Sequence, residues 1–206
     1  MKITERDVEI LRFINEFGFC EIVQIDKRFN LRKPRNYKVM GRLVNAGLVI
    51  HKKLFQNQHG YFYLSRRGAS FTELPSMTNI PLNTYSHQLR IIDVYFKLMQ
   101  QYPDAYWIGE RRLKQEKCTK RFDKRKRRHI ADGMLIFPDQ TQVAIEVELT
   151  TKGRSRLNDI LRGYASDFSI KEVWYYCSSA AIGGVRRLAT DMKYIKVNRL
   201  QDFLDS

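Results

Sequence analysis

Three carboxylates stand close together in the chain, on what the residue pattern predicts to be two neighbouring strands. Asp132 is expected at the middle of one strand, and Glu146 and Glu148 on the next. Apolar residues alternate with the two glutamates, so both should share one face of their strand. A turn at Pro138 and Asp139 would fold the strands into a hairpin. This hairpin would bring Asp132 beside the glutamates.

Carboxylates crowded in this way repel one another unless a cation holds them together. Hard oxygen ligands with no cysteine or histidine partner suit Mg²⁺ or Mn²⁺. The predicted metal ligands are therefore Asp132, Glu146 and Glu148. The alternative is a solvated sheet face on which the glutamates pair with lysine or arginine. His129 could serve as a base or a phosphate contact, or simply lie on the strand surface.

The charge of the chain is strongly positive and unevenly distributed. Its 206 residues include 37 Lys and Arg against 22 Asp and Glu, a formal net charge of +15. Residues 1–70 contain 14 basic and 6 acidic residues, and residues 110–128 contain 11 basic and 3 acidic. Two localised basic segments favour a polyanionic partner, with solvated basic loops as the alternative.

The remaining composition argues against several classes of protein. The three cysteines form no CxxC pair, which excludes a zinc signature and disfavours a secreted disulfide framework. No apolar run is long enough to span a membrane, and no apolar signal-like segment begins the sequence. We therefore expect a cytoplasmic protein with no membrane partner.

The first 70 residues show the pattern of three helices and a hairpin. Thr4 with Asp7 is an N-cap signal for a first helix that Gly18 should end. The further elements are expected as a helix over 20–29, a helix starting at Pro34, and strands over 48–55 and 61–64. The third helix should direct apolar side chains inward, namely Tyr37, Met40, Leu43 and Val44.

This order, with the phrase GRLVNAGLVIHKKLF…YFYLSRRG, resembles a winged helix-turn-helix. The resemblance implies that the third helix enters the major groove of double-stranded DNA and that the wing contacts the backbone. A winged helix used for protein contacts is the alternative. The implied DNA-binding residues of the helix and wing are Arg32, Lys33, Arg35, Asn36, Lys38, Arg42, Lys52 and Lys53, with His59 also on the wing.

A second domain is expected after a linker. Residues 71–83 contain Pro75 and Pro81 and no periodic signal, so we assign domains to 1–70 and 84–206 with 71–83 as linker. The second domain should follow the order α-β-β-β-α-β and then α-β. Its elements are expected as a helix over 86–101, a strand over 105–113, the two acidic strands, a helix over 154–168, a strand over 172–177, a helix over 180–192 and a strand over 194–197.

That order, with Asp132 before Glu146-Val147-Glu148, resembles the PD-(D/E)xK or restriction-endonuclease-like fold. The predicted fold class is thus α/β (α+β), a winged helix followed by a nuclease-like domain with a mixed central sheet. Glu148 stands where that family has lysine, a form that some restriction enzymes share. Lys152, at the start of the following helix, is expected to supply the missing positive charge.

The strings WIGERRL, RRHIADGMLIF, VAIEVELTTKGRSRL and VWYYC also resemble the MobC-type relaxases and replication-relaxation proteins of mobilisable plasmids. By this resemblance Glu110 joins the acidic site, although its alternative is a surface partner for Arg111 or Arg112. The implied catalytic residues are Glu110, Asp132, Glu146, Glu148 and Lys152. The basic segment 110–128 should bind DNA phosphates through Lys124, Arg125, Lys126, Arg127 and Arg128.

The expected function is a divalent-metal-dependent DNA endonuclease or relaxase that nicks at a plasmid origin of transfer. Its partners would be double-stranded DNA, locally melted or single-stranded DNA at the nick, and relaxosome accessory proteins. The alternative is a non-catalytic regulator or replication accessory protein with a degenerate nuclease fold. The tyrosines Tyr164, Tyr175 and Tyr176 have apolar contexts and are expected in the core, and His87 is expected as a cap or packing residue.

Overall fold

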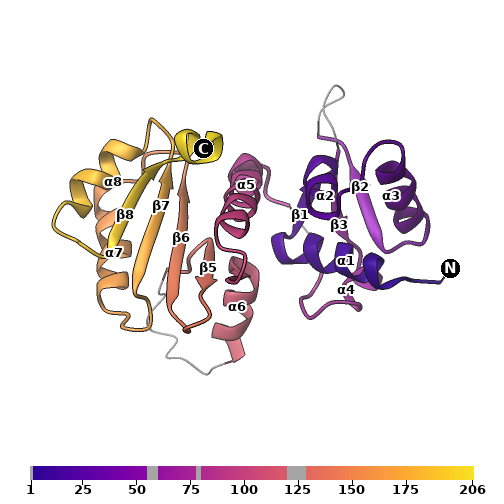
Figure 1. Ribbon diagram of the computed structural model, residues 1–206, viewed down its shortest axis with the longest axis horizontal. Coiled ribbons are helices and arrows are strands. Elements are labelled where there is room, and N and C mark those ends of the chain that lie inside the picture. The colour runs from indigo at the N-terminus through magenta and orange to yellow at the C-terminus, as the bar shows by residue number, and fades with distance from the viewer. Residues whose placement is uncertain (1, 55–59, 78–79, 120–128) are drawn as a thin grey trace. The chain divides into compact units, whose positions relative to one another are not determined.

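The chain forms two compact units, Met1–Tyr85 and Ser86–Ser206, in a computed structural model that describes residues 2–54, 60–77, 80–119 and 129–206 (Figure 1). The described residues form a mixed α+β protein with nine α-helices, a three-stranded sheet and a five-stranded sheet. The predicted wing residue His59 and the predicted phosphate contacts Lys124 to Arg128 lie outside the described residues.

The first unit contains three longer helices, a hairpin, a short further strand and a single-turn helix, α4, after the hairpin. Its three-stranded sheet is antiparallel, with the order β1-β3-β2. The elements are α1 (Glu5–Phe17), β1 (Phe19–Glu21), α2 (Ile22–Phe29), α3 (Arg35–Asn45), β2 (Val49–Lys52), β3 (Tyr61–Leu64) and α4 (Arg66–Ala69).

The first helix begins and ends where the sequence predicts. Thr4 and Asp7 form a capping box, and Gly18 ends the helix with a positive φ of 82°. Asp7 is fully buried and forms an ion pair with Arg42 of α3. Because one carboxylate both caps α1 and binds the guanidinium of α3, it fixes these two helices against each other.

Two details of this unit differ from the sequence prediction. The predicted helix over 20–29 begins only at Ile22, because residues 19–21 pair with β3 as strand β1. Tyr37 does not point inward: its side chain is exposed, and Val39 occupies the buried position. A short run of apolar residues is compatible with either a strand or a helix. Residues 19–21 form a strand because they pair with β3.

Residues 71–83 are not a free linker throughout. Leu74 and Ile80 are buried, and the amide of the buried Asn15 donates hydrogen bonds to the Thr72 hydroxyl and the Leu74 carbonyl. At the end of the unit, Tyr85 donates a hydrogen bond to Glu21. The chain after the hairpin therefore packs onto the helices of the first unit.

The second unit is built on a mixed sheet of order β4-β5-β6-β7-β8. Strand β4 pairs antiparallel with β5, and β5 pairs antiparallel with β6, whereas β6, β7 and β8 run parallel to one another. A 3-10 turn (Leu82–Thr84) at the end of the first unit precedes α5. The elements of the second unit are α5 (Tyr85–Gln101), β4 (Tyr106–Gly109), α6 (Glu110–Thr119), β5 (Gly133–Ile136), β6 (Gln142–Glu148), α7 (Arg154–Ala165), β7 (Glu172–Cys177), α8 (Ile182–Ala189), β8 (Ile195–Arg199) and α9 (Leu200–Asp205).

Strand β6 lies at the centre of this sheet and is buried on both faces. Helices α7 and α8 cover one face, and α5 lies on the other (Figure 1). Ala144 packs with residues of α7, α8 and β7 in one apolar cluster. Because side chains alternate along a strand, Glu146 and Glu148 point to the same side as Ala144. The glutamates therefore face two helices rather than solvent.

The hairpin between β5 and β6 is confirmed, since Gly133 pairs with Ile145 and Ile136 with Gln142 across the Pro138 turn. Other boundaries are corrected. Asp132 precedes β5 instead of lying in its middle. The strand expected over 105–113 ends at Gly109, where α6 begins. Helices α6 and α9 were not predicted.

None of the helices in the described ranges has the length and apolarity needed to span a bilayer.

The close approach of Gly133 to Trp107 gives a stability test. A Cβ at Gly133 would lie 2.0 Å from the indole ring, whereas a Cβ at Gly163, inside α7, meets nothing within 4 Å. Gly133→Ala should destabilise the protein by about 1–3 kcal/mol through overpacking. Gly163→Ala, the control, should stabilise it by about 0.5–1 kcal/mol. Urea denaturation measures both, and equal effects would contradict the contact.

Candidate functional site

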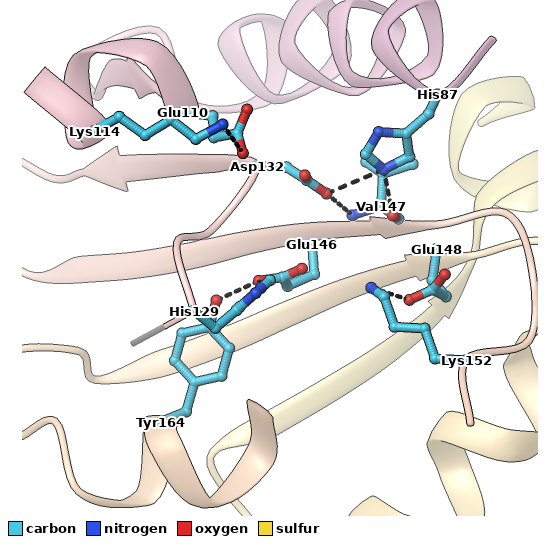
Figure 2. Close-up of polar contacts among 10 residues, drawn as sticks. All are labelled: His87, Glu110, Lys114, His129, Asp132, Glu146, Val147, Glu148, Lys152 and Tyr164. Carbon is cyan, nitrogen blue, oxygen red and sulfur yellow. Dashed lines mark hydrogen bonds and ion pairs between the residues drawn. The ribbon is translucent and has the colours of Figure 1, made fainter. Parts of the chain in front are cut away.

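The three predicted carboxylates lie around the carboxyl-terminal half of β6, but each contacts a different partner (Figure 2). Glu146 and Glu148 are 1% and 5% exposed. Burial of a carboxylate in a sheet requires hydrogen bonds or opposite charges close by. The partners identify what each carboxylate is able to do.

Glu146 is held from two sides. Its Oε1 lies 2.6 Å from Nε2 of His129, which precedes β5, and it accepts a hydrogen bond from the hydroxyl of Tyr164 on α7. Burial raises the pKa of the Glu146 carboxyl, the hydrogen bond with His129 opposes this rise, and Asp132 adds to it. The imidazole and the carboxylate therefore form a pair suited to sharing and transferring a proton.

Tyr164 is a hydrogen-bond donor to this pair. Burial, followed by the charge of Glu146, raises the pKa of the Tyr164 hydroxyl well above its usual range. The predicted core position is confirmed, since Tyr164 is 8% exposed. A tyrosine that stays protonated and bonded in this way is poorly suited to act as a nucleophile.

Asp132 is bound by main chain and by a histidine. Its Oδ2 accepts a hydrogen bond from the Val147 amide at 2.8 Å and lies 3.3 Å from Nε2 of His87 on α5. The same His87 nitrogen lies 2.8 Å from the Val147 carbonyl oxygen. Burial disfavours the charged imidazole, but the hydrogen bond and charge of Asp132 outweigh it and raise the pKa of His87 to about 9.

Glu148 forms an ion pair with Lys152, which lies just before the first turn of α7. The Lys152 side chain is 20% exposed, so its ammonium group lies at the boundary between the buried glutamate and solvent. The predicted positive charge beside Glu148 is thus present. It comes from a residue four positions along the chain, and not from the strand itself.

Glu110 is farther from this arrangement. It is the first residue of α6, its amide donates a hydrogen bond to the Asp132 carbonyl, and its carboxylate forms an ion pair of 2.6 Å with Lys114. Lys114 is thus a partner of Glu110, in addition to the Arg111 or Arg112 that the sequence suggested as alternatives. Glu110 is joined to Asp132 through main chain.

The donor chemistry fits a hard divalent cation, but the carboxylates as placed do not converge on one point. Within the described ranges, no three His, Cys, Asp or Glu side chains are grouped so as to hold a metal ion. The hydroxyl of Tyr175, opposite Glu146 on β7, is fully buried and has no hydrogen-bond partner among the described residues.

The predicted DNA-binding residues of the first unit fall into two groups. Asn36 is buried, with its amide donating to Asp26, and Arg42 is paired with Asp7, so neither is available as a base-reading side chain. These two assignments are corrected: both side chains hold helices together. The exposed candidates are Arg32, Lys33, Arg35, Lys38, Lys52 and Lys53.

His87 and His129 contact the site carboxylates, although the sequence predicted only a capping or packing role for His87 and left His129 open between a base, a phosphate contact and a strand-surface residue. His129 lies three residues before Asp132, which was a usable signal. His87 is 45 residues before Asp132, on a helix, and no spacing rule connects them. Only the packing of α5 against the sheet brings His87 to Asp132.

No protein-family model matches the chain, and neither a curated protein nor a solved structure matches it significantly. The resemblances noted in the sequence motifs therefore stay predictions.

The His87 contact predicts a pH dependence of stability. A histidine whose folded pKa is raised stabilises the fold fully below its unfolded value of about 6.5, and this contribution is lost as pH rises through about 9. The loss should be about 1–3 kcal/mol. Chemical denaturation of wild type and His87→Gln at pH 6 and pH 10 measures it. Parallel pH profiles for the two proteins would contradict the pairing.

Proposed function

We propose that this chain binds DNA and cleaves one strand of it with the help of a divalent cation, as a nickase or relaxase does. The fold we propose is a winged helix followed by a PD-(D/E)xK-like domain. The observation that carries the proposal is the site on β6: a buried Glu146 in contact with a solvent-accessible histidine, one residue before Val147, whose amide binds Asp132. Lys152 supplies a cation beside the same strand.

Asp132 and Glu146 would hold Mg²⁺ or Mn²⁺, with Glu148 as the third carboxylate. When bound, such an ion stabilises charge on the scissile phosphate and lowers the pKa of an attacking water. Because His87 and the Val147 amide both contact Asp132, they fix its carboxylate before any ligand arrives.

Two further side chains have roles in phosphodiester cleavage. The Lys152 ammonium, at the solvent boundary, is suited to stabilise the negative charge that develops on phosphate oxygens. His129 is 27% exposed and close to Glu146, so it is suited to accept the proton of a water that attacks phosphorus. The buried, protonated Tyr164 favours hydrolysis by water over covalent attack by this tyrosine.

The charge of the chain supports a nucleic-acid substrate. The exposed cations Arg32, Lys33, Arg35 and Lys38 lie at the start of α3 or just before it. Lys52 and Lys53, on the proposed wing, are also exposed. A duplex offers phosphates to both groups of cations when α3 enters a major groove. The protein would then cleave DNA at a site determined by the sequence that α3 binds.

The nuclease proposal predicts loss of nicking when the carboxylates of the site are neutralised. Asp132→Asn and Glu146→Gln keep side-chain size, and each should abolish relaxation of supercoiled plasmid in Mn²⁺ while DNA binding is retained. Lys152→Ala should slow nicking by about 10²–10³-fold, the usual cost of losing one preorganised charge-stabilising group. Agarose gels of plasmid forms against time measure the rates.

The matched control is Glu172→Gln. Glu172 is also a strand glutamate in an ion pair, with Lys196 at 2.7 Å, but it begins β7 at the opposite end of the sheet. This variant should nick at the wild-type rate. Wild-type nicking by both Asp132→Asn and Glu146→Gln, in enzyme purified free of other nucleases, would remove the proposed site.

Mutations should distinguish the residues that contact DNA bases from the residues that contact phosphates. The double variant Arg35→Ala, Lys38→Ala should lower the ratio of the affinity for specific DNA to the affinity for random DNA, because each base contact contributes about 1–3 kcal/mol of binding free energy. Alanine at Lys124, Arg125, Lys126 and Arg127 should weaken binding to all DNA alike and lower the salt slope by roughly 0.9 per phosphate contact. Fluorescence anisotropy over a salt series measures both, and the opposite pattern would reverse the assignment.

A second candidate function, a DNA-binding regulator without catalysis, is favoured by one observation. Every carboxylate of the site already has a protein partner: His87 for Asp132, His129 for Glu146 and Lys152 for Glu148. Partners of this kind inside the protein make a metal ion unnecessary for stability. Calorimetric titration with Mn²⁺, with and without DNA, separates the two candidates, because only the nuclease binds the ion.

A further inference from the structure

A pocket lies at the carboxyl end of β8, away from the carboxylates. It encloses about 520 Å³. Its lining comes from α8, the end of β8 and α9, and consists of Arg186, Val197, Asn198, Arg199, Asp202 and Phe203. In sheets with parallel strands, ligands bind outside the carboxyl ends of the strands. The place of this pocket in the fold is thus one where ligands are expected.

The strand register connects the pocket to the candidate site. Glu148 on β6 pairs with Cys177 on β7, and Cys177 pairs with Arg199 on β8. Neighbouring strands lie about 4.8 Å apart, so the main chain at Arg199 is roughly 10 Å from that at Glu148. Residues in register on parallel strands point to the same face. Arg199 and the Glu148–Lys152 pair therefore lie along one edge of the sheet.

Lys152 and the pocket residues Arg186 and Arg199 bring positive charge to this edge, which also carries the carboxylates of Glu148 and Asp202. Within the described ranges neither Arg186 nor Arg199 forms a salt bridge, and both are exposed. Two arginines against a single carboxylate, that of Asp202, leave the pocket with a net positive charge, which favours an anionic ligand with further hydrogen-bonding groups.

We propose that this pocket binds one nucleotide unit of a nucleic-acid strand, with Arg186 and Arg199 on its phosphate. Asn198 and Asp202 supply hydrogen-bonding groups for the sugar or the base edge. Phe203 supplies an apolar surface, and its ring is fixed by Tyr176 at a centroid distance of 4.3 Å. This subsite rests on the proposed action on DNA: it would hold the strand beside the nucleotide that reaches Lys152.

The pocket is more selective than a bare phosphate site. Its lining contains two arginines and one aspartate, so a free phosphate gains little net attraction. A nucleotide unit adds hydrogen bonds to Asn198 and Asp202 that inorganic phosphate lacks. We therefore expect a short oligonucleotide to bind far more strongly than inorganic phosphate at the same ionic strength.

The test is a titration of the full chain, in EDTA, with a single-stranded tetranucleotide, followed by the arginine Nε–Hε signals in NMR. Signals are assigned by their loss in Arg186→Gln and Arg199→Gln. We expect these two signals to shift and that of Arg162, at the far end of α7, to stay unchanged. Absence of a shift at both pocket arginines overturns the proposal. Equal shifts of the two arginine signals with a glutamate-rich peptide also overturn the proposal, because the pocket would then bind an acidic protein segment.

An affinity measurement complements the titration. The Arg186→Gln, Arg199→Gln double variant should bind a single-stranded oligonucleotide about tenfold more weakly or worse, because hydrogen bonds to charged groups are lost. Its salt slope should fall by about 0.7 per phosphate contact. The control with the same charge change is Arg162→Gln, Lys171→Gln, at the opposite edge of the sheet, which should bind as wild type does.

Equal losses in the two double variants would show general charge attraction and overturn the subsite. These measurements use no divalent ion and no cleavage. A failure of nicking with the pocket shifts present would therefore remove the nuclease proposal alone, and normal nicking without the shifts would remove the subsite alone.

Discussion

Burial of Glu146 at the centre of the five-stranded sheet is the constraint on which the second unit depends. A carboxylate that is 1% exposed is tolerated only if other groups satisfy it. Those groups come from two separate elements, His129 before β5 and Tyr164 on α7. The hairpin and the helix that covers β6 must therefore both be in place before this carboxylate is stable. Fold and candidate site share one set of contacts.

The same constraint shapes the chemistry of the site. Asp132 and Glu148 are also neutralised by protein cations, so the site is stable without a bound ion. A divalent cation has to compete with imidazoles and an ammonium group that are already in place. A site of this kind would couple ion binding to the release of His129 and Lys152. Those two residues would then be free beside the phosphate on which they are proposed to act.

Exposed positive charge gathers at one place in each unit. In the first unit, exposed cations surround the start of α3, and the helix is held by the buried Asn36 in its first turn and by the paired Arg42 in its last turn. In the second unit, Lys152, Arg186 and Arg199 follow the carboxyl edge of parallel strands. Buried polar residues thus fix the elements, and the exposed cations next to them remain available for phosphates.

The sequence by itself determined the local features. The capping box of α1, the hairpin around Pro138 and the two glutamates on one face of β6 follow from turn chemistry and side-chain alternation. Tertiary structure decided what those glutamates face. Apolar and polar residues alternate in the same way in a strand with one solvated face and in this central strand. The burial of Glu146 could therefore not be predicted from its spacing in the sequence. Contacts across long separations, such as His87 with Asp132, depend on helix packing, which leaves no periodic signal.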